Sequence, residues 1–378
     1  MYNILLSAAL AFLVTFFAIP VIIQIAKSKK LYDEPDERKV HKTVIPTLGG
    51  LGIFAGFILA TLMGVPHDAA NELQYFAAAA IVIFFLGIKD DIMVLSASKK
   101  FIGQLIAAGI VIKFGGIRIE NLHGFLGVYE IPHVAGIIFT LFTIIVITNS
   151  FNLIDGVDGL AGSLGLLTTL VFGAYFTYAG NIMYTVMAFS LSGSIIGFLI
   201  YNFSPAKIFM GDTGSLLLGL VNSILVIKFI NTAAVTGTAF KFGIEAAPAL
   251  GFAILIIPLF DTLRVFGLRI FDRRSPFSPD RNHIHHFLLD LGFTHKQIVL
   301  TCVTTNIFFI ALAYILRHLG TTMVVGILLF TALVLTAIVF YSRQKAKNTP
   351  ALPVNITGQE KIKQRKVLSL APEAVEAE

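Results

Sequence analysis

Two asparagines and two aspartates lie between two long apolar runs in the segment Asn149–Gly162 (NSFNLIDGVDGLAG). Asn149 and Asn152 are three residues apart and therefore share one face of a helix. Glycines follow Asp155 and Asp158, and they let the backbone turn and approach a ligand closely. An inter-helix turn with side-chain caps is the structural alternative, but such a turn needs one Asp and one Gly rather than two of each. Because unsatisfied polar groups are costly in hydrocarbon, we expect this segment at a membrane–water boundary or in a wet cavity.

Adjacent carboxylates stand at the end of another apolar run, in KDDIMVLSASKK (residues 89–100). Asp90 and Asp91 could ligate Mg²⁺ or act as a base, or they could simply form a polar helix end. The functional interpretation is favoured because an Asp at a helix C-terminus opposes the helix dipole. Lys99 is expected to be a charged membrane anchor, whereas Lys100 could equally be an anchor or hold a phosphate.

A third polar stretch, NFSPAKIFMGDTGS (residues 202–215), places Asp212 between two glycines just before an apolar run. Helix N-termini and loop amides favour anions such as phosphate. Asp212 could be an N-cap, or it could carry a metal ion to that phosphate. A cap alone does not account for the flanking FMG and TGS. Because Mg²⁺ takes oxygen ligands and usually shares them with substrate phosphates, a metal site is the favoured interpretation.

Three histidines within four residues lie in the loop 269–296, just after Arg281. His283, His285 and His286 make a cationic cluster when protonated and a donor cluster when neutral. Zinc binding is disfavoured, because no cysteine is near and the i, i+2 spacing differs from that of a zinc-binding helix. An anion site is the favoured interpretation for the cluster, with a structural role expected for one of its members.

Asp261 is an ionisable residue inside an apolar run. Such residues in membrane segments are functional candidates by default. Arg264 follows three residues later and could instead pair with it.

The composition is that of an all-α, polytopic membrane protein. Of the 378 residues, 56% are hydrophobic and only 13% are charged, whereas a soluble domain carries about 25% charged residues.

We expect a transmembrane domain over residues 1–343 and a disordered cytoplasmic tail over residues 344–378. The first run is too long for a cleavable signal peptide. About eleven runs approach spanning length; they lie near residues 3–25, 48–65, 75–88, 101–116, 133–151, 160–178, 183–201, 214–230, 247–267, 297–316 and 321–341.

Basic residues are distributed unevenly between the two sides of the membrane. All but five of the 28 Lys and Arg residues fall in the tail and in the loops that follow odd-numbered runs. The positive-inside rule makes that side cytoplasmic, so the N-terminus is expected outside and the C-terminus in the cytoplasm. The net charge of +6 then reflects topology, and no nucleic-acid partner is expected. Nearly all the polar clusters lie in these cytoplasmic loops.

One face thus carries carboxylates for Mg²⁺, amides for a polar ligand and cations for phosphate. This combination suits phosphoryl transfer, which depends mainly on positioning and charge stabilisation. No P-loop motif supports hydrolysis of ATP or GTP. The membrane location implies that one substrate is a lipid. A transporter is the alternative of another class, but it predicts charged residues near mid-membrane, broken helices and inverted repeats. A membrane scaffold accounts for none of the polar loops.

Five loop segments, taken together, resemble the signatures of the polyprenyl-phosphate N-acetylhexosamine-1-phosphate transferases, glycosyltransferase family 4. In chain order they are DEPDERKVHK…IPTLGG, KDDIMVLSASKKFIGQ, NSFNLIDGVDGLAG, NFSPAKIFMGDTGS and SPFSPDRNHIHH. The resemblance covers about residues 33–293. It implies transfer of a sugar-1-phosphate from a UDP-sugar to a polyprenyl phosphate with release of UMP. It also implies a bacterial inner (cytoplasmic) membrane location with the active site on the cytoplasmic face.

The resemblance implies a role for each matching position. Asp212 would be the principal Mg²⁺ ligand, with Mn²⁺ as an alternative metal. Asp90 and Asp91 would serve the metal and the prenyl phosphate, and Asp90 would deprotonate the attacking phosphate. Lys100 and Gln104 would line the site. The nucleotide would be held by Asn149, Asn152, Asp155, Asp158, Asn202 and, through stacking on uracil, Phe209. The sugar diphosphate would be bound by Arg281, His283, His285 and His286.

The pattern PDR followed by HIHH resembles the N-acetylglucosamine branch. Those bacterial undecaprenyl-phosphate N-acetylglucosaminyl 1-phosphate transferases prime cell-envelope polysaccharides such as lipopolysaccharide O-antigen or teichoic acid linkage units. Transfer of phospho-N-acetylmuramoyl-pentapeptide in peptidoglycan synthesis is the alternative within the family. The expected partners are UDP-N-acetylglucosamine, undecaprenyl phosphate and the lipid bilayer, and homodimer formation stays open. Direct attack by the lipid phosphate is expected, with a covalent aspartyl-phosphate intermediate as the alternative.

Overall fold

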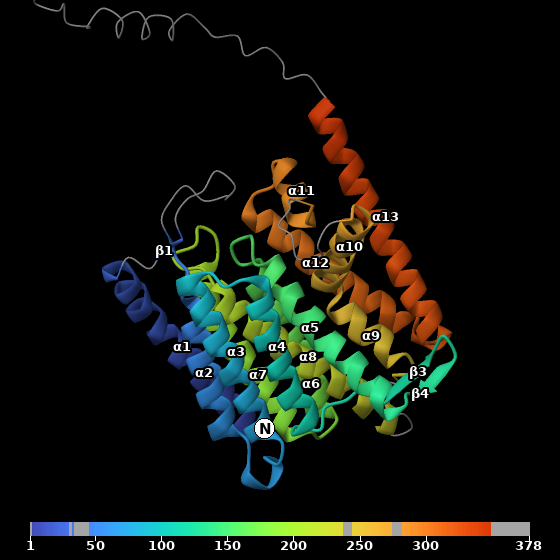
Figure 1. Cartoon of the computed structure of the whole chain (residues 1–378), viewed down its shortest axis with the longest axis horizontal. Coiled ribbons are helices and arrows are strands. Elements are labelled where there is room, and N and C mark those ends of the chain that lie inside the picture. Colours follow the sequence, from blue (N-terminus) through green and yellow to red (C-terminus); the bar gives the residue numbers. More distant parts are fainter. Residues whose placement is uncertain (1, 30–31, 34–44, 237–243, 274–281, 349–378) are drawn as a thin grey trace, which may run out of the picture.

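The computed structural model describes residues 2–29, 32–33, 45–236, 244–273 and 282–348, and these are mostly helical (Figure 1). The first eight helices are α1 Tyr2–Ser28, α2 Gly49–Gly64, α3 Leu73–Met93, α4 Ala97–Lys113, α5 His133–Ile154, α6 Leu160–Tyr178, α7 Ile182–Asn202 and α8 Gly211–Thr236. The later helices are α9 Ala247–Ile254, α10 Ile256–Phe271, α11 Ile284–Asp290, α12 His295–Ile315 and α13 Thr321–Asn348. Two antiparallel strand pairs are β1 Tyr32–Asp33 with β2 Ile45–Pro46, and β3 Asn121–Phe125 with β4 Val128–Glu130.

The expectation of a mostly helical, polytopic membrane protein is confirmed. Within the described ranges, seven helices are long and apolar enough to cross a membrane, or eight if α9 and α10 form one span. Every expected apolar run coincides with a helix or with the α9–α10 pair. However, α2 has only 16 residues, and α3 and α4 are not among the seven. The number of eleven spans and the sides on which the termini lie therefore stay predictions.

The expected single helix over residues 247–267 is wrong, because the chain breaks there. Helix α9 ends at Ile254 and α10 begins at Ile256, with a bend of 85° between them. Pro258 is one cause, because a proline ring clashes with the carbonyl four residues earlier, here that of Ile254. The freed backbone groups find a partner in Asn306 of α12. Its Nδ2 donates to the Ile254 carbonyl (3.0 Å), and its Oδ1 accepts the N–H of Ile257 (3.4 Å).

Helix α8 lies at the centre of the bundle. Of its apolar window, 94% is buried, compared with 22% for the outer helices α1 and α13. Two glycines let neighbouring helices approach its first turn. A Cβ atom on Gly50 of α2 would lie 2.2 Å from the backbone nitrogen of Gly214, and one on Gly87 of α3 would lie 2.4 Å from the Cα of Thr213. The N-terminus of α8 is therefore held directly against α2 and the C-terminal part of α3.

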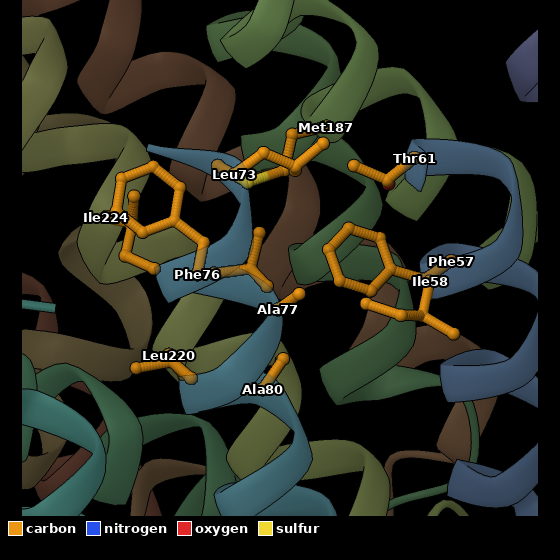
Figure 2. Close-up of a pocket in the computed structure, with 11 residues that line it drawn as sticks. Phe57, Ile58, Thr61, Leu73, Phe76, Ala77, Ala80, Met187, Leu220 and Ile224 are labelled. Atoms are coloured by element: carbon orange, nitrogen blue, oxygen red, sulfur yellow. The ribbon is translucent and has the colours of Figure 1, made fainter. Parts of the chain in front are cut away.

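The bundle is closely packed between α2, α3, α7 and α8. Figure 2 shows a small cavity there, of about 10 Å³, lined by apolar side chains such as Phe57, Phe76 and Met187. Thr61 contributes the only side-chain hydroxyl to this lining. A buried water needs about two to four polar partners, so we expect the cavity to be dry. The helix ends that carry the predicted site residues lie elsewhere, on the side of the bundle where β1 and α11 are drawn (Figure 1).

Candidate active site

Asp91, at the end of α3, holds the first turn of α8. Its Oδ1 accepts the backbone N–H of Asp212 (2.7 Å). Its Oδ2 accepts the backbone N–H (3.1 Å) and the hydroxyl (2.6 Å) of Thr213. The first N–H groups of a helix have no partner within the helix, and the helix dipole there favours a carboxylate. Asp91 is thus an N-terminal cap supplied from another helix, and it fixes the position of Asp212.

A lysine ammonium bridges two of the predicted catalytic carboxylates. Lys100, in the first turn of α4, forms an ion pair with Asp90, and its Nζ lies 2.6 Å from Oδ2 of Asp212. Asn152 of α5 donates from Nδ2 to the other oxygen, Oδ1, of Asp212 at 2.9 Å. Asp90 is 8% exposed, and its Oδ1 also accepts the N–H of Leu95. Four helices, α3, α4, α5 and α8, therefore converge on Asp212.

Two amides pair beside this cluster. Asn149 of α5 donates from Nδ2 to Oε1 of Gln104 on α4 at 2.8 Å, and also to the carbonyl of Ile145 at 2.8 Å. Gln104 is buried. The pairing leaves the Oδ1 atom of Asn149 at 3.5 Å from the Gln104 nitrogen, so a polar ligand could replace that long contact with a better one.

The turn between α5 and α6 is held by the side chains of Asn202 and His295 and by the backbone of Ala206. Oδ2 of Asp158 accepts the backbone N–H of Ala206 (3.2 Å) and lies 3.2 Å from Nδ1 of His295. Oδ1 of Asn202 accepts the N–H of Gly159 at 2.9 Å, and its Nδ2 donates to the carbonyl of Ile208 at 2.9 Å. The side chains of Asp158 and Asn202 therefore shape the loop, whatever else they contact.

Asp155 stands in the same turn and faces several carboxylates. Burial, together with the nearby carboxylates of Asp212, Asp91 and Asp158, raises the pKa of Asp155 well above its ordinary value. Mutual repulsion of this kind is relieved by a bound cation or by a proton. The turn is therefore electrostatically suited to a positive ligand.

The histidine segment, His283–His286, forms the second half of the site. Nδ1 of His283 lies 2.8 Å from Oδ2 of Asp261. His285 is 3% exposed, and burial together with the neighbouring His286 lowers its pKa to about 3. The ring centroids of His285 and His286 are 4.3 Å apart. The neutral ring is therefore favoured for His285, which suits a hydrogen-bonding role better than a cationic one.

The two halves meet at the α5–α6 turn. A Cβ atom on Gly156 would lie 2.9 Å from Nε2 of His285, so glycine is required for the histidine ring to approach the turn this closely. His295, in the first turn of α12, reaches Asp158 of the same turn. We call Asp90, Asp91, Lys100 and Asp212 with their neighbours the aspartate half of the site, and His283, His285 and His286 the histidine half. The motif at residues 149–162 stands between these two halves.

The remaining predicted residues are placed as follows. The backbone N–H of Phe209 donates to the carbonyl of Pro46 (2.7 Å), and its own carbonyl accepts the N–H of Gly49 (2.9 Å). This pairing docks the IPTLGG signature against the segment before α8. The side chain of Phe209 is half-buried. Arg281 and residues 34–44 of the first signature lie outside the described residues, as does the tail beyond Asn348.

Sequence reasoning missed three side chains that contact the predicted ones. Thr213 binds Asp91, Ser215 accepts from Asn152 at 3.0 Å, and His295 lies against Asp158. Thr213 and Ser215 were visible in the motif FMGDTGS, next to Asp212, and could have been included as polar neighbours. His295 lies within the fifth loop, between Thr294 and Lys296, but no carboxylate lies near it in sequence to single it out.

The donor set of the aspartate half is oxygen-rich. Asp90, Asp91, Asp155 and Asp212 supply carboxylates, and Asn152 an amide. Within the described ranges, no group of three or more His, Cys, Asp or Glu side chains is arranged so that it could hold a metal ion by itself.

Comparison with known proteins gives a consistent set of relatives. The model of glycosyl transferase family 4 matches residues 73–230. The chain is 32% identical over 314 residues to a decaprenyl-phosphate N-acetylglucosaminephosphotransferase of Mycobacterium leprae (strain TN), covering 77% of this chain and 78% of that one. It is 31% identical over 320 residues to a probable undecaprenyl-phosphate N-acetylglucosaminyl 1-phosphate transferase of Bacillus subtilis (strain 168), covering 84% and 86%. It is 28% identical over 279 residues to an undecaprenyl-phosphate alpha-N-acetylglucosaminyl 1-phosphate transferase of Escherichia coli (strain K12), covering 72% and 73%.

The matched region and the geometry agree. Residues 73–230 contain α3 to most of α8, which is the part of the chain that assembles Asp90, Lys100, Asn152 and Asp212. The similarity to the relatives extends over most of the chain. From these matches, and from the signatures that the fold brings to one face, we conclude that the chain belongs to glycosyl transferase family 4.

Proposed function

We propose that this protein transfers N-acetylglucosamine-1-phosphate from UDP-N-acetylglucosamine to undecaprenyl phosphate, releasing UMP. The observation that carries the proposal is the bridge of Lys100 between Asp90 and Asp212, beside the amide of Asn152. This arrangement offers carboxylates to a metal and an ammonium to phosphate oxygens within one small volume. The names of these relatives, which specify N-acetylglucosamine and a polyprenyl phosphate, support the choice of substrates.

The residues of the aspartate half fit Mg²⁺. Magnesium is usually bound by one or two carboxylates, with waters and substrate phosphates completing its octahedron. Asp212 and Asp90 would supply those carboxylates, which accounts for a site without three protein ligands. When bound, the ion would neutralise charge on the diphosphate during phosphoryl transfer.

The chain's own residues would then have separate roles in the reaction. Asp90 would accept a proton from the attacking phosphate of the lipid, because its carboxylate lies beside Lys100 and is already aligned by the N–H of Leu95. Asp91 would keep Asp212 in place through the first turn of α8. Lys100 would turn from the carboxylates to the phosphate oxygens that develop charge.

The uncharged uridine part of the nucleotide would lie along the α5–α6 turn. Asn149 and Gln104 present an amide pair to it, and the half-buried ring of Phe209 offers a stacking surface for uracil. Asn152, Asp155, Asp158 and Asn202 would complete this wall of the site. The histidine half, with Arg281, would bind the sugar diphosphate.

We further propose eleven membrane crossings, with the N-terminus outside and the active face in the cytoplasm. The uneven distribution of Lys and Arg supports this orientation. Helices α2, α3 and α4 would be three crossings in addition to the eight that result when α9 and α10 form one span. A bacterial cytoplasmic membrane follows from this proposal, because UDP-sugars are made inside the cell.

One observation favours a second candidate, membrane transport. Broken helices are frequent in transporters, and α9–α10 is such a break. However, Asn306 satisfies the backbone at the break, and the acidic residues of the site lie at helix ends rather than near mid-membrane. Flux of an ion or lipid across proteoliposomes without nucleotide would be the evidence for transport.

The test uses the purified protein in detergent with undecaprenyl phosphate, Mg²⁺ and UDP-N-acetylglucosamine. We expect release of UMP and formation of a lipid-linked sugar, both lost with EDTA. Asp212→Asn should lower turnover by about 10²–10³-fold, whereas Asp68→Asn, an exposed carboxylate between α2 and α3, should not. UMP without lipid product would indicate hydrolysis. Activity only with UDP-N-acetylmuramoyl-pentapeptide would replace the proposed sugar by the alternative within the family.

A further inference from the structure

The break between α9 and α10 aims one buried carboxylate at the histidine segment. Asn306 is fully buried and bonds to the backbone on both sides of the break. The bend of 85° turns α10 away from the direction of α9. Asp261, in the second turn of α10, is thereby brought to the start of α11; α10, α11 and α12 lie next to one another in Figure 1.

Asp261 makes three polar contacts, and two of them go to the start of the histidine segment. Its Oδ2 lies 2.8 Å from Nδ1 of His283. Its Oδ1 accepts the backbone N–H of Ile284 (3.0 Å) and a guanidinium N–H of Arg264 (2.8 Å). Asp261 is 2% exposed and His283 is 4% exposed. A buried carboxylate with all these partners is fixed in its rotamer.

The contact decides which nitrogen of His283 is available to a ligand. An ionised carboxylate only accepts hydrogen bonds, so Nδ1 of His283 donates to Asp261. The second ring nitrogen, Nε2, is then left for another partner. The ring is also held parallel to that of His285, with centroids 5.7 Å apart and an angle of 8° between the planes. Orientation of a functional histidine by a carboxylate on its other nitrogen is a general device in metal and catalytic sites.

The rest of α11 has further contacts. The ring of Phe287 lies near two guanidinium groups, that of Arg264 at 5.4 Å and that of Arg343 of α13 at 4.3 Å from the ring centroid. Arg343 also forms an ion pair with Asp290 at the end of α11. Arg343 thus holds the end of α11 through Phe287 and Asp290, whereas Asp261 contacts the first residues of the segment.

We propose that Asp261 is a positioning residue that orients His283 toward the diphosphate of the UDP-sugar. This inference rests on the proposed function. The competing explanation is that Asp261 serves only to neutralise Arg264 within the fold. The two explanations differ in whether the effect of removing the carboxylate depends on the presence of the His283 ring.

The test is a double-mutant cycle with Asp261→Asn and His283→Gln, measured as kcat and KM for the UDP-sugar. We expect Asp261→Asn to lower kcat/KM by about 10–100-fold, and to have little further effect once His283 is Gln. Independent, multiplicative effects of the two changes would overturn the proposal, as would an unchanged kcat/KM for Asp261→Asn. Asp290→Asn is the matched control, because it removes a carboxylate from the other end of α11, and its kcat/KM should stay near that of the wild type.

Folding is checked separately with a thiol-reactive fluorogenic dye, because Cys302 is the only cysteine and is buried. If Asp261→Asn melts at a much lower temperature, Asp261→Glu takes its place, since it keeps the charge but moves the carboxylate. It should lower kcat/KM in the wild type and not in the His283→Gln background, and equal losses in both would overturn the proposal. A wild-type protein that releases no UMP from any UDP-N-acetyl sugar would instead contradict the proposed function itself.

Discussion

The carboxylate of Asp91 accepts the backbone N–H of Asp212 at 2.7 Å, so the end of α3 is joined to the first turn of α8 at the predicted metal ligand. Both oxygens of Asp91 are engaged by the first turn of α8. The neighbouring Asp90 instead faces Lys100. Adjacent aspartates in the sequence thus have different surroundings, one directed to a helix N-terminus and the other to the cation of the site.

Asp91→Asn should therefore act first on stability. An amide can accept only with its single oxygen, so part of the cap at α8 is lost, at about 1 kcal/mol of unfolding free energy. The melting temperature, followed by dye labelling of the buried Cys302, should fall below that of the wild type. Asp68→Asn is the control and should melt like the wild type. An unchanged melting temperature for Asp91→Asn would mean that the cap contributes little.

Lys100→Gln should change the response to divalent cations. The ammonium of Lys100 lies between Asp90 and Asp212 and competes there with a metal ion. Without it, Mg²⁺ added in the absence of substrates should raise the melting temperature more than in the wild type. UMP release should nevertheless fall by at least about tenfold, because the ammonium no longer reaches phosphate. An equal or smaller thermal shift in Lys100→Gln would argue against this competition.

Gly156→Ala should weaken use of the UDP-sugar. The added Cβ would lie 2.9 Å from Nε2 of His285, so either the turn or the ring must move. We expect kcat/KM for the UDP-sugar to fall about tenfold with little change in melting temperature. Gly109→Ala in α4 is the matched control, because no atom lies within 4 Å of its added Cβ. Equal kinetics for both variants would show that the approach of His285 to the turn is not needed.

Asp155 should make the stability of the ligand-free protein depend on pH. Its pKa is raised in the native state by burial and by the carboxylates of Asp212, Asp91 and Asp158. Between the ordinary Asp pKa of about 3.9 and the raised value, the native state binds more protons than the unfolded state. The free energy of unfolding therefore falls as pH rises through that interval and levels off above it.

Asp155→Asn removes this dependence. Circular dichroism melts without divalent cations should show a flatter profile and a higher melting temperature at neutral pH than in the wild type. Asp68→Asn should keep the wild-type profile. If the melting temperature of Asp155→Asn follows that of the wild type across the same pH range, Asp155 does not contribute to the pH dependence of the free energy of unfolding.

Much of the helical fold could be predicted, because apolar runs carry that information directly, and the polar interruptions contain most of the side chains that the fold gathers at the candidate site. The contacts between these side chains could not be predicted from the sequence. The sequence shows Asp91 opposing the dipole of its own helix, but only the fold reveals that it completes the N-terminus of α8. Pro258 is a sign of the break after α9 that the sequence shows. Asn306, which bonds to the backbone at that break, lies 48 residues after Pro258 and could not be paired with it from the sequence. Similarly, the contact of His295 with Asp158 depends on how α12 packs.

The burial of α8 has a consequence for motion. Asp212 stands on the most enclosed of the spanning helices in the described part of the chain, whereas His283 and His285 stand at the start of a seven-residue helix held by side-chain contacts. In hydrogen exchange, the amides of α8 should open only with global unfolding, and those of α11 through local fluctuations. Entry of substrate and exit of product would then proceed by displacement of the histidine half against a fixed carboxylate.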